Sequence, residues 1–359
     1  MSFLHTNFWR GKSVFLTGHT GFKGGWLSLW LQSLGANVHG YALPPSTNPS
    51  LFDAARVADG MCSSVLGNIN DFNNLFEAIK ASEPEIVIHM AAQPLVRQSY
   101  LDPLETYTTN VIGTVHLFEA VRRSGCVKAL INVTTDKCYK NMEWEWGYRE
   151  NDILGGHDPY SSSKACSELI TDAYRNSFFN GTQTLVASVR AGNVIGGGDW
   201  SRDRLVPDIL RSVRNGNPLI IRNHSSIRPW QHVFEPLNGY MMLAERLYCD
   251  DGSNYEGPWN FGPYDGDAKT VKWIVEKITS HYELPNSWVL ENETQPHEAS
   301  KLKLDISKSL TKLGWSPMLT LDKAIELAVD WEKEMNKKSN MNSISLSQIK
   351  FFMSLLHQN

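Results

Sequence analysis

The chain has 359 residues and is 42% hydrophobic, which is enough to bury one large core or two modest ones. With 34 basic and 38 acidic residues and a net charge of −4, it offers no basic surface for nucleic acid or for an anionic membrane. No apolar run reaches the roughly 18 residues of a membrane span, and the five cysteines form no CxxC pair, so we expect reduced thiols in a cytoplasmic protein.

Short apolar runs alternate with helical patterns through the first half of the chain, which is typical of parallel strands joined by crossover helices. We expect strands at 14–17, 37–42, 65–66, 85–90, 129–134 and 184–190. We expect helices between them at 24–33, 71–82, 106–123 and 161–178. This order predicts an α/β fold with a doubly wound, Rossmann-like parallel sheet of six or seven strands.

Beyond Gly196 this rhythm breaks into loop-rich stretches, and the expected helices no longer alternate with buried strands. These helices are expected at 205–215, 236–247, 271–281 and 321–333. We therefore predict a first domain over 1–190 and a smaller mixed α+β lobe over 191–359 that covers the carboxyl edge of the sheet, with some chain crossing back to the sheet. The polar tail from Lys337 is expected to be loosely held until IKFFMSLL, which predicts a short docking helix.

Three glycines separate the first strand from the first helix in VFLTGHTGFKGG. Gly18, Gly21 and Gly24 suit a tight turn, close approach of the backbone to a pyrophosphate, and close contact between helix and sheet. The start of the helix offers free N–H groups and the positive end of its dipole to an anion. The spacing is GxxGxxG, one residue longer than the common GxGxxG, but its place between a strand and a helix predicts a dinucleotide site rather than a plain turn.

The second strand ends in HGYALPPS, without the acidic residue that would hold a ribose hydroxyl group. No Lys or Arg occurs between Tyr41 and Ala55, so a 2′-phosphate has no partner there and we favour NAD over NADP. At the end of the third strand, Asn68 and Ile69 either hold an adenine edge or form a simple turn.

Tyr160 and Lys164 are four residues apart in DPYSSSKACSEL and therefore share one helix face. Such pairs also arise by chance. The position of this pair on a helix after the strand that ends at Thr134 is what makes it significant. A phenolate near neutral pH requires the pKa of a tyrosine to fall from ~10 toward ~7, roughly 4 kcal/mol. An ammonium at ~4 Å in an effective dielectric of ~20 contributes about 4 kcal/mol. We interpret the pair as a base that removes a hydroxyl proton while hydride leaves the same carbon for nicotinamide.

Six motifs together resemble the extended short-chain dehydrogenase/reductase family, and the resemblance covers nearly all of the chain. They are TGHTGFKG, HMAAQ, TNVIGT, TTD, YSSSK and RAGNVIGGG. The resemblance implies an NAD site formed by Gly18, Gly21, Phe22, Lys23, Gly24, Asn68, Ile69, Ala91, Ala92, Gln93, Asn110, Tyr160 and Lys164.

The strand that ends at Thr134 is followed directly by Thr135, Asp136 and Lys137. In that family the nucleotide-sugar 4,6-dehydratases carry an acid–base pair at this place, commonly as Thr-Asp-Glu. The Asp-Lys version, with ALPPSTNPSLF, HMAAQPLVRQSY and RPWQHV, is similar to the dehydratases that act on CDP-glucose.

The resemblance implies a reaction in three steps that serves deoxysugar and lipopolysaccharide synthesis. Tyr160 and NAD⁺ oxidise carbon 4 of the glucose ring, which makes the carbon 5 proton acidic. Water is then lost across carbons 5 and 6 with Asp136 protonating the departing hydroxyl group, and hydride returns to carbon 6 to give a 4-keto-6-deoxy sugar.

The group that removes the carbon 5 proton is open, because Lys137 stands where the family carries glutamate. For a lysine to act as the base, its pKa must fall from ~10.4 toward ~7, which costs about 4.6 kcal/mol. A neighbouring carboxylate opposes this fall in pKa, and desolvation favours it. Our hypothesis is that Lys137 is this base, directly or through a water molecule. In the alternative, Lys137 only steadies the enolate and orients Asp136.

The second lobe is expected to hold the nucleotide diphosphate, and no residue cluster has metal-ligand spacing. The resemblance assigns substrate binding to Asn193, Arg204, Leu205, Arg228 and Asn260. A guanidinium fork at Arg228 matches a diphosphate, whereas Arg204 can equally be a solvated residue at a helix start. Trp200 either stacks on the base or packs in the core.

Three other functions can be weighed against the same sequence. A nucleotide-sugar 4-epimerase, or a dehydratase for another NDP-glucose, shares most of the motifs, and the nucleotide base itself is not fixed by them. A non-catalytic dinucleotide sensor is disfavoured by the intact pair of Tyr160 and Lys164. Members of the family commonly pair through the helices at 106–123 and 161–178, so we expect a homodimer or a homotetramer.

Overall fold

Seven parallel strands form the main sheet of the computed structural model, in the order β10-β6-β5-β4-β1-β2-β3. The structure describes residues 4–221, 224–283, 288–290 and 301–356. The strands of the first half are β1 Ser13–Thr17, β2 Asn37–Ala42, β3 Ser63–Leu66, β4 Ile86–His89, β5 Ala129–Val133 and β6 Leu185–Ala191. The remaining strand, β10 (Gly257–Phe261), returns from the second half and pairs with β6. The predicted doubly wound, Rossmann-like sheet is confirmed.

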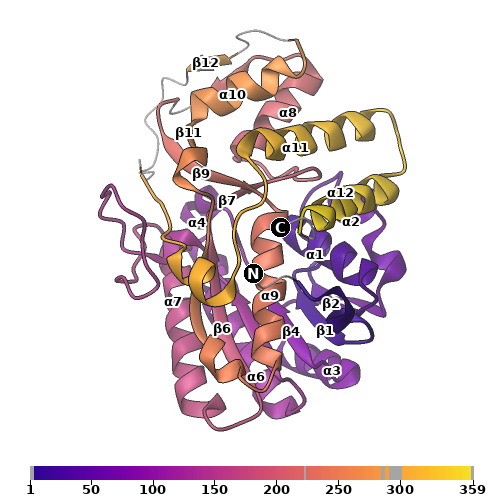
Figure 1. Ribbon diagram of the computed structural model, residues 1–359, viewed down its shortest axis with the longest axis vertical. Helices are drawn as coiled ribbons and strands as arrows, with labels where there is room; N and C mark the ends of the chain where they lie inside the picture. Colours follow the sequence, from indigo (N-terminus) through magenta and orange to yellow (C-terminus); the bar gives the residue numbers. More distant parts are fainter. Residues whose placement is uncertain (1–3, 222–223, 284–287, 291–300, 357–359) are drawn as a thin grey trace.

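Helices cover both faces of this sheet (Figure 1). Those of the first half are α1 Phe22–Ser33, α2 Leu51–Ala54, α3 Phe72–Ser82, α4 Val96–Leu101, α5 Pro103–Tyr107, α6 Gly113–Ser124 and α7 Pro159–Tyr174. One face carries α3, α6 and α7, and the other carries α1 and α9 (Phe234–Tyr248). The expected helix at 106–123 is divided into α5 and α6 by a π-helical turn at Thr108–Ile112.

The central strands are buried on both faces, and their successive side chains fill two different cores. Val14 and Leu16 of β1 lie in the larger core with α1 and α9. Phe15, between them, lies in the smaller core with α3 and α6, as does Leu130 of β5. Because both faces are covered, these strands read as continuous apolar runs, which explains why the sequence located them closely.

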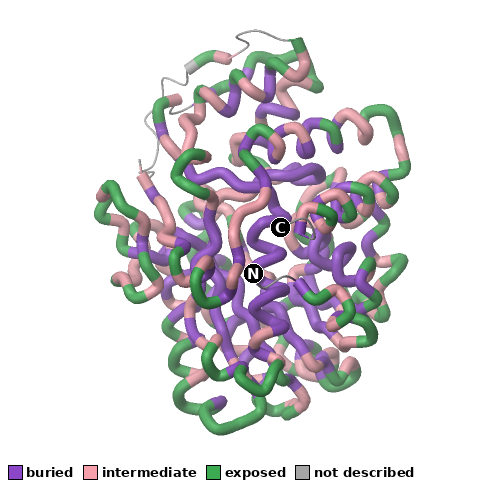
Figure 2. Tube along the Cα trace, viewed as in Figure 1, coloured by how far each residue is buried: buried purple, intermediate pink, exposed green. Residues whose placement is uncertain are grey.

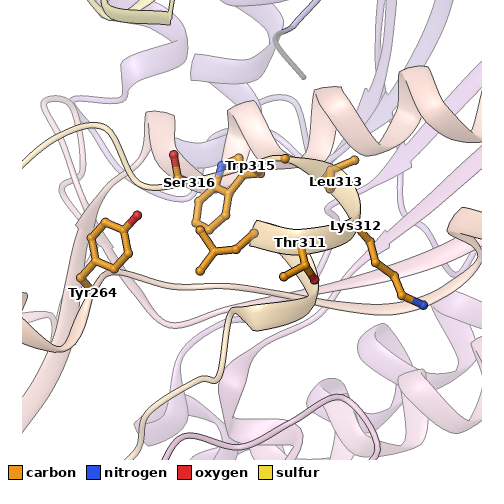
Figure 3. Close-up of a pocket in the computed structure, with 8 residues that line it drawn as sticks. Tyr264, Thr311, Lys312, Leu313, Trp315 and Ser316 are labelled. Atoms are coloured by element: carbon orange, nitrogen blue, oxygen red, sulfur yellow. The ribbon is translucent and has the colours of Figure 1, made fainter. Parts of the chain in front are cut away.

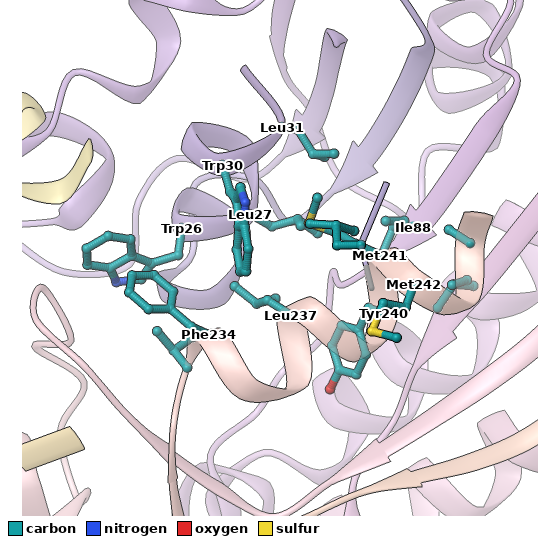
Figure 4. Packing of buried hydrophobic residues seen from close by; sticks show 14 of the residues in the cluster. Trp26, Leu27, Trp30, Leu31, Ile88, Phe234, Leu237, Tyr240, Met241 and Met242 are labelled. Carbon is teal, nitrogen blue, oxygen red and sulfur yellow. The ribbon is translucent and has the colours of Figure 1, made fainter. Parts of the chain in front are cut away.

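Large aromatic side chains join α1 to α9 (Figure 4). Trp26 and Trp30 of α1 meet the ring of Phe234 edge-on, with ring centroids 5.0 and 5.7 Å apart. Trp30 also meets Phe352 of the C-terminal helix at 5.5 Å. Such pairs add roughly 0.5–1.5 kcal/mol each beyond the burial of their area. The packing holds α1, and with it the glycine loop, against the second half of the chain.

The C-terminal tail differs from its prediction. Helix α12 (Met341–Leu356) begins well before the predicted docking segment and packs on α11 (Leu321–Asn336) and α1. The indole of Trp331 donates to Ser345 Oγ at 3.0 Å, and Gln348 Nε2 donates to Leu327 O at 2.8 Å. The prediction that 337–348 is loosely held is wrong, because Ser345 and Gln348 are buried and bond to α11, although Lys337, Lys338 and Ser347 stay exposed.

The remaining elements of the second half build a smaller lobe beyond the carboxyl ends of the main strands (Figure 1). They are β7 Asn193–Ile195, α8 Leu205–Asn215, β8 Leu219–Ile221, β9 Ile227–His232, β11 Ala268–Thr270, α10 Val271–Ser280 and β12 Trp288–Leu290. Strands β11, β9 and β7 form one small sheet, and β12 pairs with β8. Helix α9, by contrast, packs on β5 and β6 of the main sheet, so the division of the chain at residue 190 stays a prediction.

Buried residues concentrate along the main strands and α9, whereas exposed residues lie on the outer helices and the loops (Figure 2). Across the described residues, no helix combines the length and the apolar character needed to traverse a bilayer.

Replacing Phe352 by Ala removes a fully buried ring that packs against Trp30 and Phe234. We expect the free energy of unfolding to fall by about 3–5 kcal/mol, measured by urea denaturation. Ser354→Ala, on the exposed side of the same helix, is the control and is expected to stay within about 0.5 kcal/mol of the native protein. Equal stability of the two variants would contradict the docking of α12.

Candidate active site

The glycine loop turns sharply at the end of β1. Gly18 has a φ of +77°, and a Cβ on it would lie 2.8 Å from the backbone nitrogen of Ala91. A Cβ on Gly24 would lie 2.1 Å from the carbonyl oxygen of Gly18. The first glycine is therefore required by its conformation and the third by the contact between α1 and the loop. This backbone cradle, at the amino end of α1, fits the pyrophosphate of a dinucleotide.

The loop after β4 is tied to the helices beside it through Asn110. The backbone N–H of Gln93 donates to Asn110 Oδ1 at 2.8 Å, while Asn110 Nδ2 donates to Gln93 O at 3.0 Å and to Ser163 Oγ at 2.9 Å. Gln93 Nε2 donates to Thr106 Oγ1 at 2.9 Å. These side chains use their polar groups within the protein, so they fix the loop that carries Ala91 and Ala92 against α5 and α7.

At the end of β3, the structure shows the simple turn that was one of two alternatives. Asn68 Oδ1 accepts from the backbone N–H of Asn70 at 2.9 Å, and Asn68 O accepts from the hydroxyl group of Tyr41 at 3.0 Å. Ile69 is buried among the residues of the smaller core. The side chain of Ile69 therefore packs, and Asn68, which is exposed, carries the only side chain of the pair at the surface.

Asp136 and Lys137 lie in one 3-10 turn, Asp136–Cys138, that begins where β5 ends. Thr135 caps this turn: its Oγ1 accepts from the Lys137 N–H at 3.3 Å and donates to Asp136 Oδ1 at 3.0 Å. Asp136 is 3% exposed, whereas Lys137 is partly exposed. The acid is therefore enclosed, and the lysine stands at the rim of the same site.

Tyr160 and Lys164 lie on the first turns of α7, which Asp158 caps by accepting from the Ser161 N–H at 2.9 Å. Both side chains are buried. Lys164 Nζ donates to Val133 O at 3.1 Å, at the carboxyl end of β5. The structure thus brings the predicted pair to the strand end that carries the acid turn.

The pKa of Tyr160 departs from the sequence-based expectation. Burial raises the pKa of Tyr160 to about 12; a hydrogen bond with Thr135 and the charge of Arg204 lower it, and the charges of Asp136 and Asp158 raise it. Burial lowers the pKa of Lys164 to about 8, against the opposing charge of Glu168. The chain's own groups therefore do not produce the expected acidic phenol, because desolvation outweighs the nearby cations.

Lys23, on the first turn of α1, belongs to the same electrostatic cluster. Burial lowers the pKa of Lys23 to about 8, with the charges of Arg204 and Lys164 adding to the effect and that of Asp136 opposing it. The site therefore collects the cations of Lys23, Lys164 and Arg204 around one enclosed carboxylate. Such an arrangement attracts anionic ligands, of which a nucleoside diphosphate is one.

Behind the site, a buried ion pair joins α7 to β6. Arg190 Nη2 lies 2.7 Å from Glu168 Oε2, and both side chains are 3% exposed. Glu168 also accepts from Ser188 Oγ at 2.6 Å and from the hydroxyl group of Thr134. Arg190 Nη1 donates to Tyr139 OH at 2.7 Å. The network fixes the carboxyl ends of β5 and β6 relative to the helix that carries Tyr160 and Lys164.

Three of the predicted substrate residues lie on separate elements of the second half: Asn193 begins β7, Leu205 begins α8, and Arg228 lies on β9. Arg204 Nη1 donates to Asp199 Oδ2 at 3.2 Å, and its charge acts on Tyr160 and Lys23, so it is not merely a solvated helix-start residue.

One assignment to the substrate, that of Asn260, is corrected, and Trp200 takes the packing alternative. Asn260 is fully buried: its Oδ1 accepts from Tyr139 OH at 2.7 Å, and its Nδ2 donates to Tyr148 O at 2.8 Å and to Asp305 O at 3.1 Å. Both polar atoms of its amide group are bonded within the protein. Asn260 therefore ties β10 to the loops instead of binding a nucleotide. Trp200 packs edge-on against Trp331, with centroids 5.5 Å apart.

No role was predicted for Glu168, or for Gly192 within the motif RAGNVIGGG. Glu168 follows Lys164 by one helical turn, a spacing that the sequence does show. Gly192 carries no such signal, because a Cβ on it would meet Asp136 and Pro229, which lie far away along the chain.

Figure 3 shows a surface hollow in the second half of the chain. It is lined by Tyr264 and residues 310–316, none of which is a predicted site residue. Among the described residues, no group of His, Cys, Asp and Glu is arranged to hold a metal ion.

A family model described as GDP-mannose 4,6 dehydratase matches residues 15–328 of this chain. The chain belongs to this family. It is 55% identical to the CDP-glucose 4,6-dehydratase of Salmonella typhimurium strain LT2, over 97% of this chain and 98% of that protein. It is 23% identical to a dTDP-glucose 4,6-dehydratase of Xanthomonas campestris pv. campestris strain B100, over 88% of this chain and 92% of that one. The nucleotide-sugar 4,6-dehydratase family expected from the sequence is confirmed.

Solved structures share the fold of this dehydratase family member. MoeE5 in complex with UDP-glucuronic acid and NAD superposes with a TM-score of 0.77 at 22% identity, covering 90% of this chain and 99% of that one. The dTDP-glucose 4,6-dehydratase of Bacillus anthracis in complex with NAD gives 0.76 at 22% identity, covering 92% and 100%. A UDP-glucose 4-epimerase of Thermotoga maritima also gives 0.76. The fold alone therefore does not separate dehydratase from epimerase.

Replacing Thr135 by Val removes a hydrogen bond that lowers the pKa of Tyr160. The phenolate then requires a higher pH, so we expect the rising limb of the pH–rate profile for carbon 4 oxidation to move to higher pH. At neutral pH the rate should fall about tenfold, the worth of one hydrogen bond to a charged group. The absorbance of reduced nicotinamide in a single turnover measures this rate. Thr135→Ser keeps the hydroxyl group and is the control; a profile shifted equally in both variants would exclude this role.

Proposed function

We propose that this protein converts CDP-glucose to CDP-4-keto-6-deoxyglucose with NAD as its cofactor. The observation that carries the proposal is the turn of Asp136 and Lys137, which lies beside Tyr160 and Lys164 at the end of β5. A 4-epimerase needs only the Tyr–Lys pair, whereas loss of water needs an additional acid near the sugar. The 55% identity to a CDP-glucose 4,6-dehydratase over nearly the whole chain supports this substrate.

The first step uses Tyr160 as the base for the hydroxyl proton on carbon 4. Bound NAD⁺ supplies a positive ring that favours the phenolate, takes up hydride from carbon 4 and returns it to carbon 6. Thr135 orients the phenol through its hydrogen bond, and Lys164, anchored on Val133 O, brings a buried amino group to the same strand end. Because the surrounding site is buried, the charges of these groups act at reduced screening.

The elimination step uses the acid turn. Once carbon 4 is a ketone, the carbon 5 proton is acidic, and Lys137 removes it. Asp136, enclosed and held by Thr135, protonates the hydroxyl group that leaves carbon 6. One turn thus carries an enclosed acid and a partly exposed amine. Their different environments suit the opposite proton transfers, donation by Asp136 and removal by Lys137.

The nucleotide is held by the second lobe. We assign the diphosphate to the guanidinium groups of Arg204 and Arg228, and further contacts to Asn193 and Leu205. Arg228 is buried on β9, directly opposite Lys269 of β11, so positive charge is placed on this small sheet. Two guanidinium groups match the two phosphates in charge and in fork geometry.

The product formed from CDP-, dTDP-, UDP- and GDP-glucose tests the proposal. We expect a 4-keto-6-deoxy sugar, detected by its absorbance in strong alkali, with CDP-glucose turned over at the highest kcat/KM. Galactose in place of the keto sugar would assign the chain to the 4-epimerases. Preference for another nucleotide would retain the dehydratase and overturn the CDP assignment.

Lys137→Met tests the base of the elimination step. If Lys137 removes the carbon 5 proton, the variant should lose solvent deuterium uptake at carbon 5 by about a hundredfold or more, the usual contribution of a general base. Oxidation at carbon 4 should persist, because Tyr160 performs it. Lys140→Met, an exposed lysine just beyond the same turn, is the matched control. Unimpaired exchange in Lys137→Met would leave this lysine only the role of orienting Asp136.

We further propose a cytoplasmic homodimer or homotetramer that acts in deoxysugar and lipopolysaccharide synthesis. Its support is a set of exposed apolar side chains on the expected pairing helices. These are Leu104 (77% exposed), Ile112 (46%), Leu169 (59%) and Phe178 (50%). Light scattering measures the assembly, and the mass of a single chain would refute the pairing.

A further inference from the structure

Gly192 lies between β6 and β7, where the chain passes from the main sheet to the second lobe. A Cβ on Gly192 would lie 2.9 Å from Asp136 Oδ2 and 3.3 Å from Pro229 Cγ. The φ of Gly192 is outside the left-handed range, so its backbone accepts an alanine without strain. This position therefore requires glycine because there is little space for a side chain, and not because of its backbone conformation.

The two carboxylate oxygens of Asp136 have different surroundings. Oδ1 accepts a hydrogen bond from Thr135 Oγ1 at 3.0 Å. Oδ2 takes part in none of the hydrogen bonds found in the described part of the chain, and it is not among the fully enclosed polar atoms there. Oδ2 is thus the oxygen that remains to exchange a proton with a ligand, and it lies against Gly192.

The charge of Asp136 acts on Tyr160 and on Lys23, so the carboxylate lies near both the phenol and the start of α1. Gly192 stands next to Asn193, the first residue of β7, and borders the carboxylate at Oδ2. The glycine therefore meets the acid at a place that is also close to the groups assigned to carbon 4.

We propose that Gly192 is a positioning residue for the elimination step, because its missing side chain gives Asp136 Oδ2 the room to face the departing hydroxyl group. The inference rests on the proposed dehydratase function. In this step Lys137 takes the carbon 5 proton, the electrons of the carbon 5–hydrogen bond form the double bond to carbon 6, and Asp136 reacts as the protonated acid. The bond from carbon 6 to oxygen breaks, and that oxygen takes the proton of Asp136 and leaves as water.

Gly192→Ala tests this role. The methyl group displaces the end of a short side chain and no backbone, so the fold should be retained. Misplacement of a reacting group by about 1 Å lowers rates up to about a hundredfold. We expect kcat for CDP-glucose to fall about ten- to a hundredfold with an unchanged KM. Reduced nicotinamide should accumulate, because oxidation at carbon 4 precedes the use of Asp136.

A double-mutant comparison separates an effect through Asp136 from a general disturbance. In an Asp136→Asn background the acid is already lost, so Gly192→Ala should slow the reaction no further. Gly266→Ala is the control glycine: a Cβ there meets nothing within 4 Å and its φ is ordinary, so activity and melting temperature should match the native protein.

An unchanged kcat in Gly192→Ala would overturn the inference. Slowing of carbon 4 oxidation by the same factor as kcat would also overturn it, as would a melting temperature below that of Gly266→Ala. A further ten- to hundredfold loss of kcat on adding Gly192→Ala to Asp136→Asn would do the same. A native protein that does not dehydrate CDP-glucose would instead overturn the proposed function. The two failures are distinct, because the first appears only in the variants.

Discussion

The buried ion pair of Glu168 and Arg190 is the interaction on which the geometry of the site depends. It joins α7, which carries Tyr160 and Lys164, to β6, and through Thr134 it reaches the end of β5 as well. Removal of one partner of such a pair typically costs 3–5 kcal/mol, because the other charge stays buried. The hydrogen bonds from Ser188 and Thr134 replace those that the carboxylate of Glu168 would make to water, so its charge persists one helical turn after Lys164.

Burial also sets the electrostatics of the site, and it acts in opposite directions on acids and amines. It raises the pKa of Tyr160 while it lowers those of Lys23 and Lys164 toward about 8. The amines are thereby brought close to neutral pH, where small changes in nearby charge decide their protonation. In the proposed reaction the phenol becomes a base only with the help of an additional positive charge, which a bound dinucleotide would supply.

The features that the sequence predicted well are those set by local pattern. Continuous apolar runs located the strands, and the acid turn and the Tyr–Lys pair met in space because a strand end and the following helix start are neighbours in any doubly wound sheet. The failures depend on tertiary contacts. Asn260 proved to be a fully bonded core amide, the segment from Lys337 to Gln348 found buried partners on α11, and the room at Gly192 arises from residues far apart in sequence.

The return of β10 to the main sheet has a consequence for biosynthesis of the protein. Until the ribosome has delivered Gly257–Phe261, β6 is an unpaired edge whose N–H and C=O groups are open to other chains. The face that α9 covers is likewise bare until Phe234–Tyr248 has been synthesised, since α1 and the strands supply only part of that core. The nascent first half is therefore an aggregation-prone intermediate, and a fragment that ends near residue 190 would be expected to need a chaperone or a complementing second fragment.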